Sequence, residues 1–329
     1  RKSNYDKSPS TTVDGALWKG WESVLDKLKD VCNVPEELAR KVVVIECYHG
    51  VYPEELAEHL ATLHPSLMIH SDQCFKGVED IEKMTRPYLT DDRLFGRRAP
   101  FYYADFLDAI KAATGLVIVY GHAAAEVVPE ADVLVYVDMA RWEIQQRFRQ
   151  GKIDGLGVRN REEAPSLHYK RGYFIDWNVC DALKKQLLPK ADYWLDTHIP
   201  GMPKMITGET LRAGLEKTAR KPFRVVPFFD PAPWGGQWMK EVCDLDKEQA
   251  NFGWCFDCVP EENSLYLKVE GDRISRSVST SWIRWEGVTS VCRYTRLPSI
   301  SVIRSASIIH RTKVIICWMP ERIQPFTSV

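Results

Sequence analysis

Five short apolar runs recur through the first two hundred residues, with helix-forming segments between them. They lie at 41–48, 67–71, 116–121, 131–138 and 192–197. Apolar runs without a polar alternation are typical of strands buried on both faces, as in parallel sheets covered by helices on either side. The sequence therefore predicts an α/β fold with a mainly parallel sheet and flanking helices.

The segments between the runs place apolar residues at helical spacing. In 17–31, Trp21, Leu25 and Leu28 recur on one side with charged residues between them. The segment 53–63 begins with Pro in its first turn and Glu directly behind it, a common start of a helix. Further helices are predicted at 103–114, 141–151 and 176–189.

The composition of the chain changes near residue 220. The segment 221–246 is dense in Pro, Gly and aromatic residues between short strand-like runs, which is typical of all-β structure. We predict four parts: an N-terminal arm and helix over 1–36, an α/β domain over 37–215, the start of a β domain over 216–271, and a tail over 272–329.

The turn after the first apolar run is where an α/β nucleotide-binding domain would hold phosphate. Such a loop needs Gly for tight turns, Lys to reach the phosphates and Ser or Thr for magnesium. The segment 46–60 contains Gly50 but no Gly-Lys-Ser/Thr, and Pro53 and Glu54 stand at the helix start. Because carboxylates there repel phosphate, we predict a degenerate loop that does not bind ATP.

The order of elements over 41–197 resembles a uridine-kinase-type P-loop fold. In that family a strand carrying Gly is followed by a strand ending in Asp and a helix with several Arg. The corresponding residues here are Gly121, Asp138, Arg141, Arg147 and Arg149. The resemblance implies a P-loop-kinase-like sheet in a degenerate, non-catalytic relative. From the residues alone, Asp138 is predicted to cap the helix near Arg141, and the arginines to form a solvated face.

Two further clusters contain residue types that bind anions or metals. The segment 168–177 groups His168, Lys170, Arg171 and Tyr173. Lys170 and Arg171 are candidate anion ligands, although an exposed basic turn ahead of a helix is the favoured interpretation. Cys255 and Cys258 form a single CxxC without the second ligand pair that zinc requires, so they are predicted to be free thiols. No metal site is predicted.

The most specific stretch is 223–242, where a Pro-rich strand leads into Trp234, Gly235 and Gly236. It resembles the entry to type I mannose-6-phosphate isomerases, and the resemblance continues through 251–269. Two Gly after a Trp permit backbone geometry that side chains would block, while the indole covers an apolar surface. These three residues are therefore assigned to a structural turn, and the resemblance implies an incomplete cupin-type β segment.

The isomerase resemblance implies a zinc enzyme that interconverts mannose 6-phosphate and fructose 6-phosphate. In the family, a Gln and a His of a QVHP-type segment hold the metal together with a Glu and a second His. The metal polarises the open-chain sugar while a base moves a proton between adjacent carbons. None of these ligand motifs is present after Val269. We therefore expect neither zinc nor catalysis in this chain, and assign no catalytic or cofactor residue.

The tail over 272–329 contains nine Lys or Arg against three Asp or Glu and has no sustained period. Synonymous codons for 274–329, read one nucleotide earlier, yield a sequence that contains QVHP and alternating β patterns. We interpret the tail as an out-of-frame product of an isomerase gene, with a stretch lost near 271. It is predicted to be irregular, leaving the strands at 223–229 and 264–269 without partners.

Composition is that of an ordinary globular protein, with 45% apolar and 27% charged residues. No apolar run reaches the length of a membrane span, and an odd number of scattered Cys favours reduced thiols and a cytoplasmic location. Two alternatives stay open: a small-molecule or nucleotide-binding regulatory protein built on the α/β domain, and a nucleic-acid binder using the basic tail. The frame interpretation makes the basic charge an artefact, so neither a nucleic-acid nor a membrane partner is expected.

Overall fold

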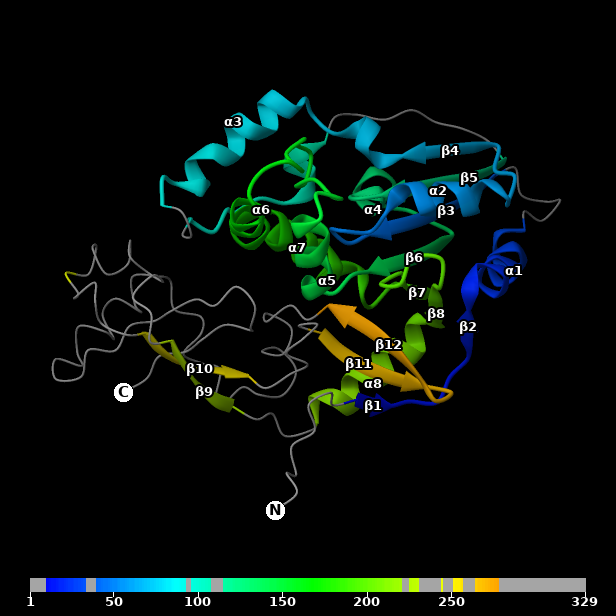
Figure 1. The fold of residues 1–329 in the computed structure, drawn as a ribbon. Helices are drawn as coiled ribbons and strands as arrows, with labels where there is room; N and C mark the ends of the chain where they lie inside the picture. The colour runs from blue at the N-terminus through cyan, green and yellow to red at the C-terminus, as the bar shows by residue number, and fades with distance from the viewer. Residues whose placement is uncertain are drawn as a thin grey trace, which may run out of the picture.

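A seven-stranded sheet forms the centre of the computed structural model, in the order β2-β8-β7-β6-β3-β5-β4 (Figure 1). The structure describes residues 10–33, 40–92, 96–107, 115–220, 225–230, 244, 251–256 and 264–277. The strands of this sheet are β2 (Leu17–Lys19), β3 (Arg40–Cys47), β4 (Leu67–His70), β5 (Gly115–Gly121), β6 (Val133–Asp138), β7 (Tyr193–Asp196) and β8 (Lys204–Thr207).

The five apolar runs form five consecutive strands of the sheet, which pair in parallel from the edge strand β4 through β5, β3 and β6 to β7. The prediction of an α/β fold with a mainly parallel sheet and flanking helices is confirmed. Two short antiparallel strands, β8 and β2, extend the sheet beyond β7 and were not predicted. β8 pairs with β7, which lies just before it in the chain, whereas β2 pairs with β8 from far away in the sequence. Strands of three or four residues carry little periodicity of their own.

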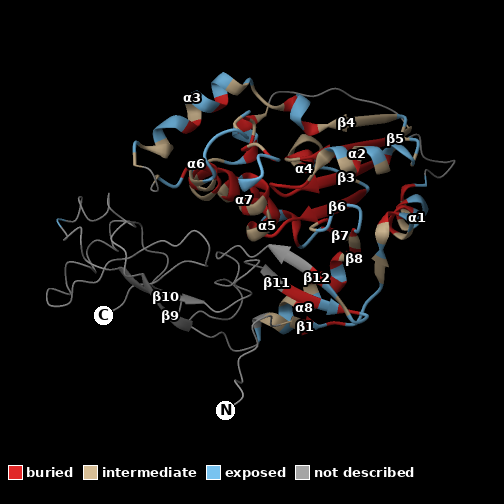
Figure 2. Ribbon diagram, viewed as in Figure 1, coloured by how far each residue is buried: buried red, intermediate tan, exposed pale blue. Residues whose placement is uncertain are grey.

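Helices cover both faces of the sheet (Figures 1 and 2). They are α1 (Gly20–Cys32), α2 (Pro53–Ala61), α3 (Val78–Leu89), α4 (Ala124–Val127), α5 (Arg141–Arg149), α6 (Pro165–Arg171), α7 (Trp177–Leu187) and α8 (Gly208–Ala219). Short 3₁₀ turns, η1 (Ser71–Cys74) and η2 (Tyr103–Phe106), and one π-helical segment, η3 (Gly172–Asp176), connect some of them.

Two helix predictions need correction. The helix expected from residue 17 begins at Gly20, whose φ of 75° breaks the chain direction after β2. The segment 103–114 was predicted to be one amphipathic helix, but Tyr103–Phe106 form a 3₁₀ turn and residues 108–114 lie outside the described part. Helices α3, α6 and α8 were not predicted.

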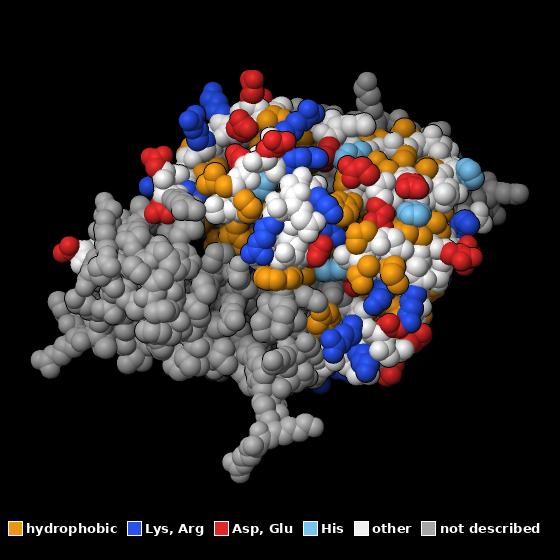
Figure 3. Space-filling view, in the orientation of Figure 1, with side chains coloured by type: hydrophobic (Ala, Val, Ile, Leu, Met, Phe, Trp, Pro, Cys, Tyr) orange, Lys and Arg blue, Asp and Glu red, His pale blue; other side chains and the backbone are white. Residues whose placement is uncertain are grey.

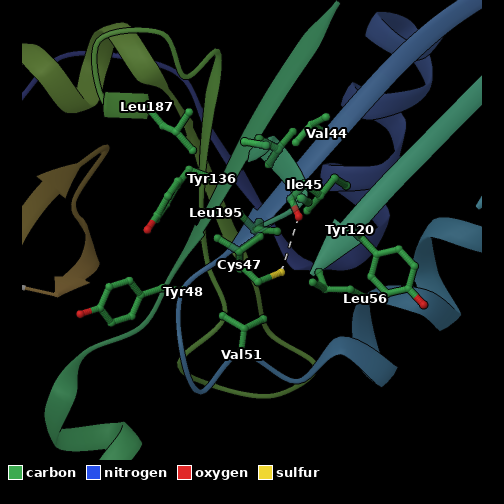
Figure 4. Close-up of a cluster of buried hydrophobic side chains, with 14 of the residues drawn as sticks. Val44, Ile45, Cys47, Tyr48, Val51, Leu56, Tyr120, Tyr136, Leu187 and Leu195 are labelled. Atoms are coloured by element: carbon green, nitrogen blue, oxygen red, sulfur yellow. Dashed lines mark hydrogen bonds between the residues drawn. The ribbon is translucent and has the colours of Figure 1, made fainter. Parts of the chain in front are cut away.

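The core of the domain lies on both faces of β3, as its apolar run requires. Val43 and Val44 are completely buried, and full burial of such a side chain stabilises the fold by roughly 1.5–3 kcal/mol. In the close-up of Figure 4, Tyr48 and Tyr136 lie on one side of the sheet, and Leu56 and Tyr120 lie on the other. The sheet is therefore a layer between two apolar surfaces.

A second sheet joins the two ends of the described chain, in the order β1-β11-β12. Its strands are β1 (Ser10–Thr12), β11 (Ser264–Val269) and β12 (Asp272–Ser277). β1 pairs with β11 in parallel, and β11 pairs with β12 in antiparallel orientation. A separate two-stranded sheet pairs β9 (Val225–Asp230) with β10 (Asn251–Phe256).

These pairings correct the expectation for the tail and for the strands before it. The strand at 264–269 has a partner on each side, and the one at 225–230 pairs with β10. Residues 272–277 form a regular strand, because Glu270 and Gly271 both adopt positive φ and make a two-residue hairpin turn. Residues 278–329 lie outside the described part, as do Trp234, Gly235 and Gly236.

Candidate functional site

The topology of the main sheet identifies where an α/β domain of this kind would bind a ligand. From β3 the chain passes to β4 and β5 on one side and then to β6 and β7 on the other. The carboxyl ends of β3, β5 and β6 therefore meet at a topological switch point, where open α/β sheets place their ligands. The turns that follow these strands form the candidate site.

The turn after β3 is closed by an arginine from a distant helix. Gly50 has φ of 93°, and its carbonyl oxygen accepts a 2.6 Å hydrogen bond from Nη1 of Arg147. A Cβ at Gly50 would lie 2.8 Å from Cγ1 of Ile144, so α5 packs directly on this turn. The predicted degenerate phosphate-loop position is thus a tight turn that approaches α5 closely.

Arg147 is one of the most deeply buried charged residues of the domain, with 1% of its surface exposed. Its Nε donates to Glu143 at 2.9 Å, and its Nη2 donates to the carbonyl oxygens of Thr197 and His198. The guanidinium also lies 3.9 Å from the ring centre of Tyr52. The hydrogen bonds of Arg147 therefore connect its own helix, α5, to two other segments. These are the turn that follows β3 and the segment that follows β7.

The expectation of a solvated arginine face on α5 is wrong for two of its three residues. Arg147 is buried, and so is Arg141, which pairs with Asp181 at 2.7 Å and lies over the ring of Trp177. Arg149 is exposed as predicted. The sequence shows that these residues are charged, but not that Arg141 packs against α7 or that Arg147 packs against the turns after β3 and β7.

A buried carboxylate holds the turn after β5. Both oxygens of Glu46 accept 2.9 Å hydrogen bonds, one from the amide of Ala123 and the other from that of Ala125. Ala123 has φ of 62°, which is strained for a residue with a side chain. Burial raises the pKa of Glu46 to about 8, although the amide hydrogen bonds lower it. The amides at the start of α4 therefore bind a carboxyl group of the protein itself.

Two histidines lie side by side at the switch point. The rings of His49 and His122 meet edge to face with centres 6.0 Å apart. His49 Nε2 bonds the carbonyl oxygen of Asp154 at 2.8 Å, and His122 Nδ1 bonds that of Cys47 at 2.9 Å. Burial lowers the pKa of His49 to about 4 and also lowers the pKa of His122. Both rings are neutral at pH 7 and offer no positive charge to a phosphate.

The two candidate anion ligands at 170–171 lie on α6 and are buried. Lys170 Nζ donates to the carbonyl oxygens of Thr90 and Asp92. Arg171 pairs with Asp176 at 3.4 Å and donates to the carbonyl oxygen of Leu156 at 3.2 Å. The interpretation as an exposed basic turn is therefore wrong. Both cations hold neighbouring segments in place, and the anion site stays a prediction.

Asp138 does not cap α5, contrary to the prediction. The residue before that helix is Ala140, which makes no side-chain cap. Asp138 instead accepts 2.8 Å hydrogen bonds at both oxygens from Nζ of Lys184, and both side chains have no exposed surface. The ammonium also lies over the rings of Tyr48, Tyr136 and Trp194, 4.9–5.8 Å from their centres. Lys184 was not found from the sequence, because nothing in a helical Lys signals full burial.

The described part of the chain contains no group of three or more His, Cys, Asp or Glu that could hold a metal ion. The residues present there do not fit a zinc centre. Of the CxxC pair, Cys255 lies in β10 and Cys258 lies outside the described residues.

The surface offers no simple guide to a partner. Figure 3 shows Lys and Arg interspersed with Asp and Glu over the coloured part of the face it draws. None of the described helices has the length and apolar character needed to cross a bilayer.

Comparison with known proteins places the domain in a family. A family model described as a domain of unknown function (DUF8485) matches residues 20–220, so the chain belongs to this family. No curated protein matches. Among solved structures, a protein from Silicibacter sp. TM1040 described as a fructose transport system kinase is similar over 50% of this chain and 92% of its own. Its sequence identity is 14% and its TM-score 0.31, too low to support an inference about function.

We expect Lys184→Met to lower the free energy of unfolding by about 3–5 kcal/mol, because Asp138 would then be buried without its cation. Urea unfolding of the purified chain measures this. Lys190→Met, at an exposed position shortly after α7, is the matched control and should change the free energy by less than about 0.5 kcal/mol. A loss for Lys184→Met no larger than the control would contradict the structural role of the pair.

We expect Glu46→Gln to change how stability depends on pH. The folded pKa of Glu46 is about 8, above its ordinary value of 4.5, so folding takes up a proton between these values. Its contribution to the free energy of unfolding is complete below about pH 4.5 and is lost as pH rises through 8. Wild type should therefore lose more stability than Glu46→Gln between pH 5 and pH 8.5 in urea unfolding. Parallel pH profiles would refute this, and Glu58→Gln, an exposed carboxylate on α2, is the control.

Proposed function

We propose that residues 20–220 form a non-catalytic, P-loop-kinase-like domain of a long-form type I mannose-6-phosphate isomerase. The observation that carries the first half of this proposal is the hydrogen bond from buried Arg147 to the carbonyl oxygen of Gly50. The assignment to an isomerase rests on the sequence around Trp234 and on the alternative reading frame of residues 274–329.

The kinase-like assignment is supported by the order and direction of the elements. A central parallel strand, β3, leads through a turn into α2, and β5 ends at Gly121. β6 ends at Asp138 and is followed by the arginine-containing α5. This is the order of a uridine-kinase-type P-loop fold, and α/β connectivity of this kind places a ligand at the carboxyl ends of the strands.

The proposed loss of phosphoryl transfer is supported by the partners of the charged groups at the switch point, which lie within the protein. A phosphate loop directs backbone amides and a Lys toward the phosphates, whereas the turn at Gly50 binds a guanidinium through its carbonyl oxygen. The start of α2 contains Glu54 and Glu55, and the amides at the start of α4 are bonded to Glu46. The starts of α2 and α4 thus already carry carboxyl groups of the protein itself.

The isomerase assignment is supported by the Trp234-Gly235-Gly236 turn motif and by the QVHP segment recovered in the alternative frame of the tail. The side chain of Ile274 is completely buried, and Asp272 pairs with Lys19. This fit supports a frame change after Ile274, slightly later than residue 271. The ligand of the family is a sugar phosphate and its metal is zinc, but this chain lacks the zinc ligands and is proposed to be inactive.

An alternative is that the domain binds a small molecule or nucleotide and acts as a regulatory module. The strained Ala123 turn favours it, because strain maintained at a switch point commonly accompanies function. In this version His122, which follows β5 directly, would contact the ligand.

We expect no saturable binding of magnesium–ATP to the full chain in isothermal titration calorimetry. The physical reason is that the turn at 47–52 offers no Lys and presents a carbonyl oxygen to Arg147. A P-loop kinase titrated in the same buffer is the positive control. Binding with micromolar affinity would overturn the non-catalytic assignment and favour the regulatory alternative.

Restoring the reading frame after residue 274, together with the missing stretch, should produce a protein that contains stoichiometric zinc and interconverts mannose 6-phosphate and fructose 6-phosphate. The present chain should do neither, because it lacks the ligand segments. Metal analysis and a coupled isomerase assay measure both properties. Replacing the His of the restored QVHP segment by Ala is the control and should abolish zinc and activity together. Stoichiometric zinc in the present chain would contradict the proposal.

A further inference from the structure

The N-terminal arm, Ser10–Val13, occupies the edge of a strand that is more than 250 residues away in the sequence. Thr11 is the parallel partner of Leu267, and the amide of Val13 donates a 2.9 Å hydrogen bond to the carbonyl oxygen of Lys268. Adjacent parallel strands need a crossover connection. Here the whole α/β domain provides it, so the two ends of that domain meet in one sheet (Figure 1).

One face of this small sheet is buried against α8. Thr11, Val13 and Leu267 are 0–4% exposed, whereas Thr12 and Lys268 are exposed. This alternation along the arm shows that the arm has a defined inner face. The arm is therefore packed as a core strand.

Helix α8 has small side chains where the arm and β11 cross it. A Cβ at Gly214 would lie 2.8 Å from Leu267 and 3.0 Å from Val13, so a larger residue would push the strands away. One turn further on, Thr218 Oγ1 donates to Thr11 Oγ1 at 2.8 Å. The face of α8 around Gly214 and Thr218 thus leaves room for small β-branched side chains of the arm.

The hairpin β11–β12 is also fixed from its other side. Lys19 pairs with Asp272, and Lys204 Nζ donates to the carbonyl oxygen of Arg273 at 2.8 Å. β12 lies against β6 and β7 of the main sheet. The hairpin 264–277 is therefore joined to the main sheet.

From these contacts we propose that the edge of β11 and the face of α8 around Gly214 and Thr218 form a strand-addition site. Its occupant is the N-terminal arm of the same chain. The site accepts an extended peptide with small β-branched residues at alternating positions, recognised by main-chain hydrogen bonds and by this face of α8. The arm holds the hairpin 264–277 on the α/β domain and covers an edge that would otherwise pair with other chains. This inference does not rest on the isomerase assignment.

Hydrogen exchange tests the proposal in the full chain and in a variant that lacks residues 1–13. Deletion should raise amide exchange in 264–269 by roughly tenfold or more, while exchange in β3 stays unchanged. A synthetic peptide of residues 8–14 should restore protection, and the same peptide with Thr11→Asp should not. Unchanged exchange in 264–269 after deletion, or failure of the peptide to restore it, would overturn the proposal.

Point variants keep the test decisive if the deleted chain does not fold. Val13→Asp and Gly214→Val should each raise exchange in 264–269, because both prevent the arm from packing on α8. Thr12→Asp, at the exposed position between the two inner residues of the arm, is the matched control and should have no effect. Native mass spectrometry completes the test: a dimer that dissociates on deletion would show that the arm binds a second copy, and would overturn its assignment to the same chain.

Discussion

The fully buried ion pair between Lys184 and Asp138 is the interaction on which the arrangement of the domain depends. It joins α7 to the end of β6 at the centre of the sheet, and neither side chain reaches solvent. A charge in such a place is tolerated only when its partner and hydrogen bonds compensate the lost hydration. The rings of Tyr48, Tyr136 and Trp194 complete the surroundings of the ammonium. The need to surround the Lys184 ammonium with its partners therefore fixes the relative positions of α7, β6, β7 and the end of β3.

The need of buried charged groups for partners also explains why the switch point differs from that of a phosphate-binding enzyme. Arg147 is compensated by Glu143 and by carbonyl oxygens, including that of Gly50. Glu46 is compensated by the amides of Ala123 and Ala125. In a phosphoryl-transfer site such amides and cations are directed at the substrate. Here each of them has a partner within the protein, so the charges at the switch point have a structural use.

The pairing of β1 with β11 fixes the hairpin 264–277 on the α/β domain, which a flexible linker would not do. Arm and hairpin lie on opposite sides of the domain in sequence and are adjacent in space. Because the hairpin also contacts β6 and β7, the domain and the start of the following segment share a core around Leu267 and Ile274.

The sequence by itself determined the parallel sheet, because a run of adjacent apolar residues such as 42–45 is satisfied by a strand buried on both faces. It also determined that the turn at Gly50 lacks the residues of a phosphate loop. Only the tertiary structure decided the partners of the charged residues. From the sequence, Lys184 and Arg147 are predicted to be exposed, and their burial follows from how α7 and α5 pack on the sheet. The antiparallel strands β2 and β8, and the arm at Ser10–Val13, are too short to carry a period of their own. β2 and the arm are fixed by hydrogen bonds to strands far away in the sequence, which local sequence does not encode, whereas β8 pairs with the neighbouring β7 as well as with β2.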